Sequence, residues 1–552
     1  MTDTVKIVLI PLDNRPVSYT LPQQIASLNK NIKVFAPPRE FLGGLVSYSQ
    51  VDKILEWLDE ILKQEKIDYI VASLDTIAYG GLIPSRRLNT SPEEIIKNLT
   101  IFKKIVNCNR LPRRGNAPPR NDGLPKIYAF SSIMRISDSY VNEEEKEYWD
   151  KFGKEIFKYS YFKHKADVIA RNEAIQTPLN NEWITSSQAP RNDEQTLHEL
   201  KNKIPLEILE DYLKTRERNF SINRFYLNWI EENFLDYLVF SKDDTGQFGI
   251  NVQEAETLDA EIQDKKLADK AITLTGADEI PSDLVSKAIV DNADCEQRLK
   301  GGGDEPSTGT PFMASNQVTS QTIKIFPVFS TENGKNVISR YEDKTIFESV
   351  SGQIKLCGGE IPDSAENADM ILLVHTPENI QNDHCLKIYP ESENKDAVKF
   401  CIDFIKNSQK PVIIGDISCA NGGDNLLVMQ MLDHEEIINK IYGYAGWNTT
   451  GNTLGTVISI GISRFIAEKT GNFELSNFKK TLLTRLSDDW AYQTVVRQKI
   501  RAITNLADRK TLKEELVPLV LNLTKKIECN LNLSDLNVDF PWNRTFEVEI
   551  II

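Results

Sequence analysis

Two pairs of adjacent acidic residues stand just after short apolar runs of the chain. They are Asp243 with Asp244 and Asp278 with Glu279. Hydrolysis of a glycosidic bond uses two carboxyl groups, one of them protonated and the other ionised. Because desolvation raises the pKa of a glutamate that follows a buried strand, Glu279 is expected to be the general acid. We therefore predict that these four residues are catalytic, with Asp243 or Asp244 as the ionised partner.

Other apolar runs are followed by carboxylates, arginines, amides or aromatic residues. Ligands of α/β proteins bind beyond the carboxyl ends of the strands, so these side chains are expected to meet in one site. Carboxylates and amides bind the hydroxyl groups of a sugar, and an aromatic ring packs against its apolar face. Trp447 is the expected stacking ring. The predicted substrate-binding residues are Asp13, Arg15, Asp75, Tyr79, Arg86, Arg135, Asp416, Asn421, Asp424, Trp447, Asn448 and Asn452.

The same residue types allow two other interpretations. In one, the aspartates at the strand ends gather Mg²⁺ or Mn²⁺, and the arginines hold a phosphorylated or carboxylated small molecule. In the other, the chain is a non-catalytic protein whose two lobes close over a small molecule. The sequence assigns no metal ligands and no cofactor. It leaves open whether a divalent cation is needed, and it leaves the oligomeric state unknown.

Residues that other kinds of catalytic site require are scarce. Only His375 of the five histidines follows a predicted strand, which leaves little material for a zinc site or a Ser-His-Asp triad. The seven cysteines include no Cys-x-x-Cys pair, which argues against a disulfide framework and a zinc knuckle. No Walker loop is present, and no Gly-x-Gly-x-x-Gly follows the first strand. The expected partner is therefore a small molecule or a sugar.

The composition argues against nucleic acid and membrane as partners. The chain has 552 residues, of which 80 are acidic and 65 basic, giving a formal net charge of −15 at pH 7. Such a surface repels the phosphate backbone of a nucleic acid. The sequence has no run of 18 apolar residues, and its first residues lack the basic start and apolar stretch of an export signal. We therefore expect a cytoplasmic protein.

The elements that must position these residues are predicted from ten short apolar runs. Several runs are continuously apolar, as parallel strands covered on both faces require. Amphipathic stretches such as 50–65 and 91–106 lie between them and predict helices. This alternation predicts an α/β fold with mainly parallel sheets in two Rossmann-like lobes, or alternatively an elaborated β/α barrel. The predicted strands are 6–12, 32–36, 69–74, 126–130, 235–240, 271–275, 323–329, 370–374, 411–415 and 441–445.

A stretch at 291–322 that is rich in Gly, Ser, Thr, Asn and Asp predicts a linker or a long loop. It separates an N-terminal α/β domain, residues 1–290, from a second α/β domain, residues 323–455. The sequence pattern of residues 456–552 predicts a mostly helical C-terminal region. The Pro/Arg/Asn-rich segment 107–125 predicts a surface loop.

A polar segment near the C-terminus has helical spacing. Within the string DDWAYQ at 488–493, Asp489 and Gln493 are four residues apart and therefore lie on one face of a helix. The two side chains can point together into a cleft, but a solvated face is the favoured expectation.

Several strings of the sequence resemble the marks of a bacterial family known only as a domain of unknown function. The strings SKDD, GADE and DDWAYQ also resemble marks of that family. The resemblance extends over nearly the whole chain, and it implies membership of that family without implying a reaction, a cofactor or a catalytic residue. The main strings are PLDNRP at 11–16, SLDTIAYGGLIPSR at 73–86, NGGD at 421–424, YAGWNTTGNTLGT at 444–456 and PWNRTFE at 541–547.

Overall fold

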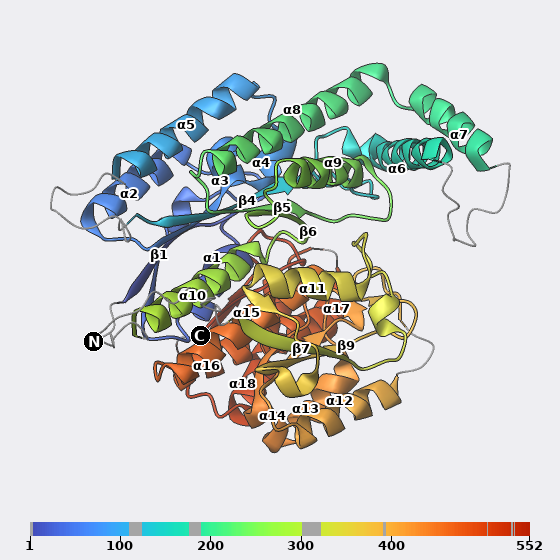
Figure 1. The fold of residues 1–552 in the computed structure, drawn as a ribbon. Coiled ribbons are helices and arrows are strands. Elements are labelled where there is room, and N and C mark those ends of the chain that lie inside the picture. The colour runs from blue at the N-terminus through green and yellow to red at the C-terminus, as the bar shows by residue number, and fades with distance from the viewer. Residues whose placement is uncertain are drawn as a thin grey trace.

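The computed structural model describes residues 4–109, 124–175, 189–300, 322–389, 394–504, 506–531, 534 and 536–552. Two all-parallel sheets, one of six and one of five strands, form two lobes covered by helices (Figure 1). All ten predicted strands are present as strands. The predicted α/β class with parallel sheets is confirmed, and because both sheets are open, the alternative of a barrel is wrong.

The strands of the first sheet are β1 (Val5–Ile10), β2 (Ile32–Phe35), β3 (Tyr69–Ser73), β4 (Lys126–Ile133), β5 (Tyr237–Lys242) and β6 (Ala271–Thr275). Their order across the sheet is β2-β1-β3-β4-β5-β6. Successive side chains point to opposite faces, so Val8 and Ile10 join one hydrophobic cluster while Ile7 and Leu9 join another. Every residue of β3 is buried. Burial on both faces explains why these strands are continuously apolar rather than alternating.

The helices of the first lobe cover both faces of the first sheet, except for two that extend beside it, α6 and α7 (Figure 1). They are α1 (Pro16–Ala26), α2 (Val51–Gln64), α3 (Leu74–Tyr79), α4 (Leu82–Arg87), α5 (Pro92–Asn109), α6 (Trp149–Ile175), α7 (Ala189–Lys203), α8 (Leu206–Glu231), α9 (Ile250–Asp264) and α10 (Ile280–Lys300), with the short 3₁₀ turn η1 (Arg39–Phe41). The apolar spacing of α2 buries Ile54, Leu55 and Leu58, as predicted for 50–65. Figure 1 shows α2, α5, α8 and α9 on the outer face, and α1 and α10 on the face toward the second lobe.

The second sheet contains β7 (Ile323–Phe329), β8 (Gly359–Glu360), β9 (Met370–His375), β11 (Val412–Asp416) and β13 (Ile441–Ala445). A separate pair of two-residue strands consists of β10 (Asn382–Asp383) and β12 (Cys419–Ala420). The order across the second sheet is β13-β11-β9-β7-β8. Counted within the lobe, this is the order 2-1-3-4-5, which the first five strands of the first sheet share. In such doubly wound sheets the ligand crevice lies beyond the strand ends where the order reverses, here between β1 and β3 and between β7 and β9.

The helical elements of the second half are η2 (Gly334–Asn336), α11 (Ile346–Leu356), η3 (Ala365–Asn367), α12 (Lys395–Asn407), α13 (Asn425–Leu432), α14 (Glu435–Lys440), α15 (Thr450–Lys469), α16 (Leu475–Arg485), η4 (Leu486–Val496), α17 (Arg497–Ile503) and α18 (Arg509–Lys526). η4 is a π-helix, a rare form that is frequent at functional sites. The antiparallel pair β14 (Asn537–Asp539) and β15 (Glu549–Ile551) follows. The predicted helical C-terminal region is therefore confirmed.

The two lobes share a hydrophobic core. One cluster contains side chains of the first sheet, of α10, α11 and α15, and of the second sheet. Residues 291–300 of the predicted linker are the last turns of α10, whereas its residues 301–321 lie outside the described residues. Residues 110–123 of the predicted loop also lie outside them. Within the described ranges, no helix is long and apolar enough to cross a membrane.

Candidate functional site

The segments that follow β1 and β6 bring one set of predicted residues together. Arg15, the residue before α1, is buried and forms ion pairs with Asp13 (Nη2–Oδ2 2.7 Å) and Asp278 (Nη2–Oδ1 2.5 Å). Its Nη1 atom lies 3.3 Å from Oε1 of Glu547. Burial raises the pKa of Asp278 to about 6, although the charge of Arg15 acts in the other direction. One guanidinium is therefore shared by three buried carboxyl groups.

A second set of charged residues lies at the ends of β3, β4 and β5. Arg86 of α4 is fully buried, contacts Asp243 and lies 3.2 Å (Nη1–Oε2) from Glu144. Arg135 follows β4 and lies 2.8 Å (Nη2–Oε2) from Glu144 and 2.9 Å (Nε–Oε1) from Glu145. The charges of Arg135, Arg544 and Arg86 hold the pKa of Glu144 well below its usual range, although burial acts in the other direction.

Arg135 also holds the predicted carboxyl pair. Its Nη1 atom lies 3.1 Å from Oδ2 of Asp244 and 4.0 Å from Oδ2 of Asp243. The Asp244 side chain is 35% exposed, compared with 16% for Asp243. Loss of hydration and the neighbouring charge of Asp243 raise the pKa of Asp244 to about 7. Asp244 also has a φ of 24°, a conformation that non-glycine residues seldom adopt and that often marks functional sites.

The segment 542–547 joins the two sets. Arg544 lies 2.5 Å from Glu144 (Nη1–Oε1) and 2.5 Å from Glu547 (Nη2–Oε1). The Cζ atoms of Arg15 and Arg544 lie 4.6 Å and 4.7 Å, respectively, from the centroid of the Trp542 ring. Sequence reasoning recognised this string as a family mark but did not assign Glu547 or Arg544 to the site, and it also missed Glu144 and Glu145.

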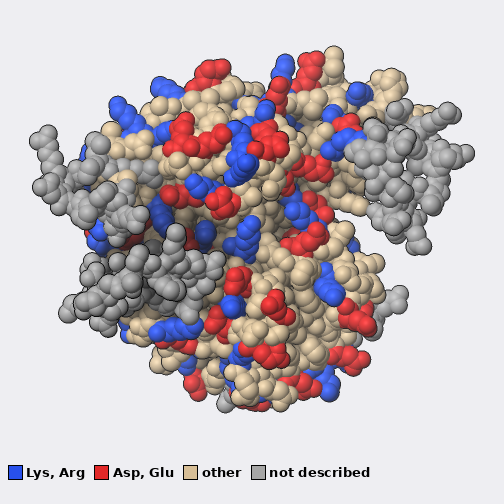
Figure 2. Space-filling model, viewed as in Figure 1, with Lys and Arg blue, Asp and Glu red and all other residues tan. Residues whose placement is uncertain are grey.

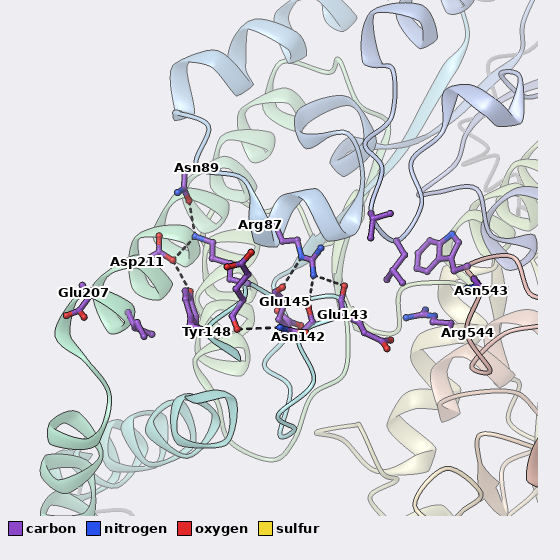
Figure 3. A pocket seen from close by; sticks show the side chains of 16 residues that line it. Arg87, Asn89, Asn142, Glu143, Glu145, Tyr148, Glu207, Asp211, Asn543 and Arg544 are labelled. Atoms are coloured by element: carbon purple, nitrogen blue, oxygen red, sulfur yellow. Dashed lines mark hydrogen bonds and ion pairs between the residues drawn. The ribbon is translucent and has the colours of Figure 1, made fainter. Parts of the chain in front are cut away.

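An open pocket of about 800 Å³ lies beside this network (Figure 3). Arg87 donates hydrogen bonds to the carbonyl oxygens of Glu145, Asn142 and Glu143, which fixes the loop between β4 and α6. Glu145 and Arg544 belong both to the pocket wall and to the ion-pair network. The wall is formed by Leu45, Val46, Arg87, Asn89, Asn142, Glu143, Glu145, Lys146, Glu147, Tyr148, Glu207, Ile208, Asp211, Trp542, Asn543 and Arg544.

A third polar group occupies the carboxyl edge of the second sheet. Asp416, the last residue of β11, accepts hydrogen bonds from the Asp424 backbone N–H (2.7 Å) and the Tyr444 hydroxyl (3.0 Å). Burial raises the pKa of Asp416 to about 6. Asp424 caps α13 and lies 3.2 Å (Oδ2–Nε2) from His375. Burial opposes ionisation of Asp424, but the hydrogen bond and charge of His375 lower its pKa to about 2.

The π-helix η4 faces this third group. Arg485 lies 2.8 Å (Nη1–Oδ1) from Asp489 and 3.1 Å (Nη2–Oδ2) from Asp488. The backbone N–H of Gly446 donates to Asp489 Oδ2 at 2.8 Å. Asp489 and Gln493 are fully buried, so the expectation of a solvated face is wrong. Apolar neighbours on both sides bury this segment, and an arginine and a backbone amide satisfy its charge.

Asp75 and Tyr79 are buried near the end of β3, apart from the ion-pair network. Asp75 accepts hydrogen bonds from the Ser132 backbone N–H (2.8 Å) and the Ser131 hydroxyl (3.3 Å), and burial raises its pKa to about 6. The Tyr79 hydroxyl is buried and has no hydrogen-bond partner within the described part of the chain. Neither side chain lines the pocket.

The predicted amide and tryptophan residues of the second lobe support backbone and core. Asn421 donates to Asp383 (Nδ2–Oδ1 3.2 Å), and the Asn448 carbonyl accepts from the Asn421 backbone N–H (2.8 Å). Asn452 donates to Thr449 in the first turn of α15. Trp447 is 5% exposed and packs against Phe546 at 5.9 Å. A stacking role for Trp447 toward a ligand stays a prediction. It requires that the ring, which is buried in this structure, become exposed.

Glu279 lies between the lobes rather than at the pocket. Its side chain is fully buried, accepts a hydrogen bond from Gln353 (Oε1–Nε2 2.9 Å) and accepts another from the Ala277 backbone N–H (3.0 Å). Burial and the neighbouring Asp283 raise its pKa well above the usual range. The burial of Glu279 favours its protonated form, but Glu279 does not line the pocket.

Among the described residues, no group of three or more His, Cys, Asp or Glu side chains is arranged to hold a metal ion. The acidic residues at the first sheet edge are instead paired with arginines. No curated protein matches the chain, and no solved structure matches it. The model of a family described as protein of unknown function (DUF4127) matches residues 7–551, so the chain belongs to this family, which confirms the resemblance read from the sequence.

Proposed function

We propose that the protein is a hydrolase that cleaves a glycosidic bond of a carbohydrate, with Asp243 and Asp244 as its carboxyl pair. The observation that carries this proposal is the shared placement of both carboxyl groups on Arg135. Neither aspartate is itself a residue of the pocket wall, but Arg135 also pairs with Glu145, which lines the pocket of about 800 Å³. Because both oxygens lie within 4.0 Å of the same nitrogen, the two groups are closer than the ~9.5 Å upper limit used by glycoside hydrolases.

The two aspartates have different environments, which suits two different roles. Asp244 is the more exposed, and its pKa of about 7 lets it keep a proton near neutral pH. It is the general acid that donates to the glycosidic oxygen. Asp243 contacts the fully buried Arg86 and is the base or nucleophile of this proposal. This assignment replaces Glu279 as the proposed acid, and Asp278 orients Arg15 rather than touching substrate.

The arrangement of the arginines favours a carbohydrate substrate over a phosphorylated or carboxylated one. Arg15, Arg86 and Arg135 each have at least two carboxylate partners within 4.0 Å. An anionic substrate would have to displace these carboxylates before an arginine could bind it, and the surrounding acidic groups would repel it.

The test measures release of reducing ends from a panel of oligosaccharides and aryl glycosides. Asp244→Asn and Asp243→Asn are each expected to lower kcat by about 10²–10⁴-fold. Asp244→Asn should do so without lowering the melting temperature, whereas Asp243→Asn also removes an ion-pair partner of the buried Arg86. Asp403→Asn, which removes an exposed ion pair with Lys399 within α12, is the matched control and keeps full activity. Glu279→Gln is expected to retain turnover, because Glu279 does not face the pocket.

Three results would contradict the proposal. One is a wild-type protein that binds a panel member, with a rise in melting temperature, and releases no product. Another is loss of turnover with EDTA and recovery with Mg²⁺ or Mn²⁺, which would favour a metal-dependent enzyme. The last is equal loss of turnover in Glu279→Gln and Asp244→Asn, which would return the acid to Glu279.

A further inference from the structure

Two arginines of α17 lack acidic partners. Arg497 and Arg501 are four residues apart, so their side chains lie on the same face of the helix. Neither forms an ion pair with any residue that the structure describes. Over the visible face of the molecule, by contrast, acidic and basic side chains are intermixed (Figure 2). In a chain with a formal net charge of −15, two neighbouring arginines without a carboxylate are unexpected.

Arg497 is the more deeply buried of the two, with 4% of its surface exposed. Its Nη1 atom donates to Gln493 (Oε1 2.9 Å), and its guanidinium lies 5.1 Å from the centroid of the Phe546 ring. Its Nε atom is buried and has no hydrogen-bond partner among the described residues. Burial of a charge is unfavourable unless a group of opposite charge accompanies it. The guanidinium therefore has both a charge and a donor to offer to an anion.

His384 is a second unpartnered group in the same place. It is 7% exposed, and neither ring nitrogen forms a hydrogen bond within the described part of the chain. The Gly423 carbonyl, which lies near the ring, accepts from the Thr494 hydroxyl (2.8 Å) instead. Burial lowers the pKa of His384, nearby carboxylates raise it, and the charge of Arg497 lowers it, so the guanidinium lies near the ring. In either protonation state the ring carries at least one N–H donor.

Arg501 and Tyr389 connect these groups to the surface. Arg501 is half-buried and donates to the carbonyl of Cys385, the residue after His384 (Nη1–O 3.2 Å). Tyr389 is 50% exposed, and its ring centroid lies 5.6 Å from that of His384. Burial raises the pKa of the Cys385 thiol, whereas the charges of Arg497 and Arg501 both lower it, so both guanidinium groups lie near Cys385. The two arginines and the histidine therefore meet at one place, which reaches solvent beside Tyr389.

The two carboxylates whose charges act on His384 are engaged elsewhere. Asp383 accepts from the Tyr341 hydroxyl (2.7 Å) and from two backbone N–H groups of its own turn. Asp424 caps α13 and pairs with His375. Neither forms an ion pair with an arginine of α17. The cationic groups are thus left for a ligand from solution.

We infer that Arg497, Arg501 and His384 form a binding site for a phosphate group. A guanidinium binds phosphate oxygens through a fork of N–H groups, and the Nε atom that Arg497 leaves unpaired is part of that fork. Phosphate carries close to two negative charges at neutral pH, which two arginines match better than they match the single charge of a carboxylate. None of the three residues lines the pocket of Figure 3. The inference therefore goes beyond the proposed function and does not depend on it.

The test titrates the full chain at pH 7 and low salt, with calorimetry as the readout. The probes are inorganic phosphate, glucose 6-phosphate and acetate. At least one of the two phosphate probes is expected to bind about tenfold or more tightly than acetate. If glucose 6-phosphate binds more tightly than inorganic phosphate, the ligand is a phosphorylated small molecule, whereas the reverse order identifies free phosphate.

Variants then locate the bound phosphate. Arg501→Gln, at the half-buried end of the site, is expected to weaken phosphate binding about tenfold or more with little change in melting temperature. Arg497→Lys keeps the charge but not the fork, and should weaken binding as well. The matched control is Arg224→Gln, an exposed arginine paired with Glu261, which should bind as the wild type does. Absence of binding by both phosphate probes would overturn the inference, as would acetate binding of equal strength or an Arg501→Gln variant with wild-type affinity.

Discussion

Asp283 offers a quantitative test of how the two lobes are joined. It lies in the first turn of α10 and is fully buried against α11 and α15. Its Oδ1 atom accepts hydrogen bonds from Ser459 (2.9 Å) and the Cys357 thiol (3.4 Å), whereas Oδ2 has no partner among the described residues. Burial raises the pKa of Asp283 to about 8. Burial and the charge of Asp283 also raise the pKa of the neighbouring Glu279.

The sign of the pH dependence follows from linkage. The pKa of an unfolded aspartate is about 3.9, so the folded state holds the proton more tightly. The stability contributed by this proton is complete below about pH 4 and is lost as pH rises through about 8. Between pH 6 and pH 8 the free energy of unfolding should fall by about 2 kcal/mol from Asp283 alone. An asparagine keeps the acceptor for Ser459 and Cys357 but does not ionise.

We therefore expect Asp283→Asn to flatten the pH dependence of stability. Urea unfolding followed by tryptophan fluorescence at pH 6, 7, 8 and 9 measures it. The variant should be close to the wild type at pH 6 and more stable by about 2 kcal/mol at pH 8. The stability curve of Asp403→Asn, which removes an exposed ion pair within α12, should run parallel to the wild-type curve. If the Asp283→Asn curve also runs parallel to the wild-type curve, the native Asp283 is ionised at pH 6 and the reasoning is wrong.

Other predictions address the site and its supports. For the proposed hydrolase reaction, the rate should fall as pH rises through about 7, because Asp244 loses its proton there, and a pH–rate profile checks this. Arg544→Met should lower the free energy of unfolding by about 3 kcal/mol, since Glu144 and Glu547 lose a buried partner; denaturation by urea would show it, and an unchanged midpoint would contradict it. Gly276→Ala should reduce the melting temperature, because φ is 125° and a Cβ would lie 1.7 Å from Glu279 Oε1, whereas Gly246→Ala has open space and should not. Thr345→Ala should cost about 1 kcal/mol of stability by removing the capping box of α11, measurable by the same urea titration.

The strands were predictable because burial on both faces leaves a strong signal in the sequence. β3 and β9 are buried along their whole length, so polar residues are excluded from them and first appear where the strands end. The rule that ligands bind beyond strand ends predicted that these polar residues lie close together, and Arg15 indeed contacts Asp278 while Arg86 contacts Asp243. A residue's place after a strand does not fix the direction of its side chain, however. Asp278 and Glu279 follow the same strand, yet one pairs with Arg15 and the other turns into the junction between the lobes.

Residues that join the site from distant segments carry no local signal. Arg544 contacts Glu144 across 400 positions of the chain. Glu144 and Glu145 stand in a loop without periodicity, and a charged loop is usually solvated. Their roles depend on a tertiary arrangement in which the segment 542–547 lies against the ends of β1, β4 and β5. Only the coordinates show that Glu145 and Arg544 lie both on the pocket wall and in the ion-pair network.

The π-helix η4 explains why helical spacing misled the sequence reasoning at this point. An α-helix aligns residues that are three or four positions apart, which paired Asp489 with Gln493. A π-helix bonds residue i to residue i+5, so it aligns residues five positions apart instead. Gln493 accordingly donates to Asp488 (Nε2–Oδ1 3.1 Å), and it also donates to the carbonyl of Phe546 (3.3 Å). Asp489 is thereby released to receive the Gly446 amide at the edge of the second sheet. One rare helical form thus gives neighbouring aspartates different partners, with Asp488 accepting from Gln493 and Asp489 accepting from Gly446, the residue after β13.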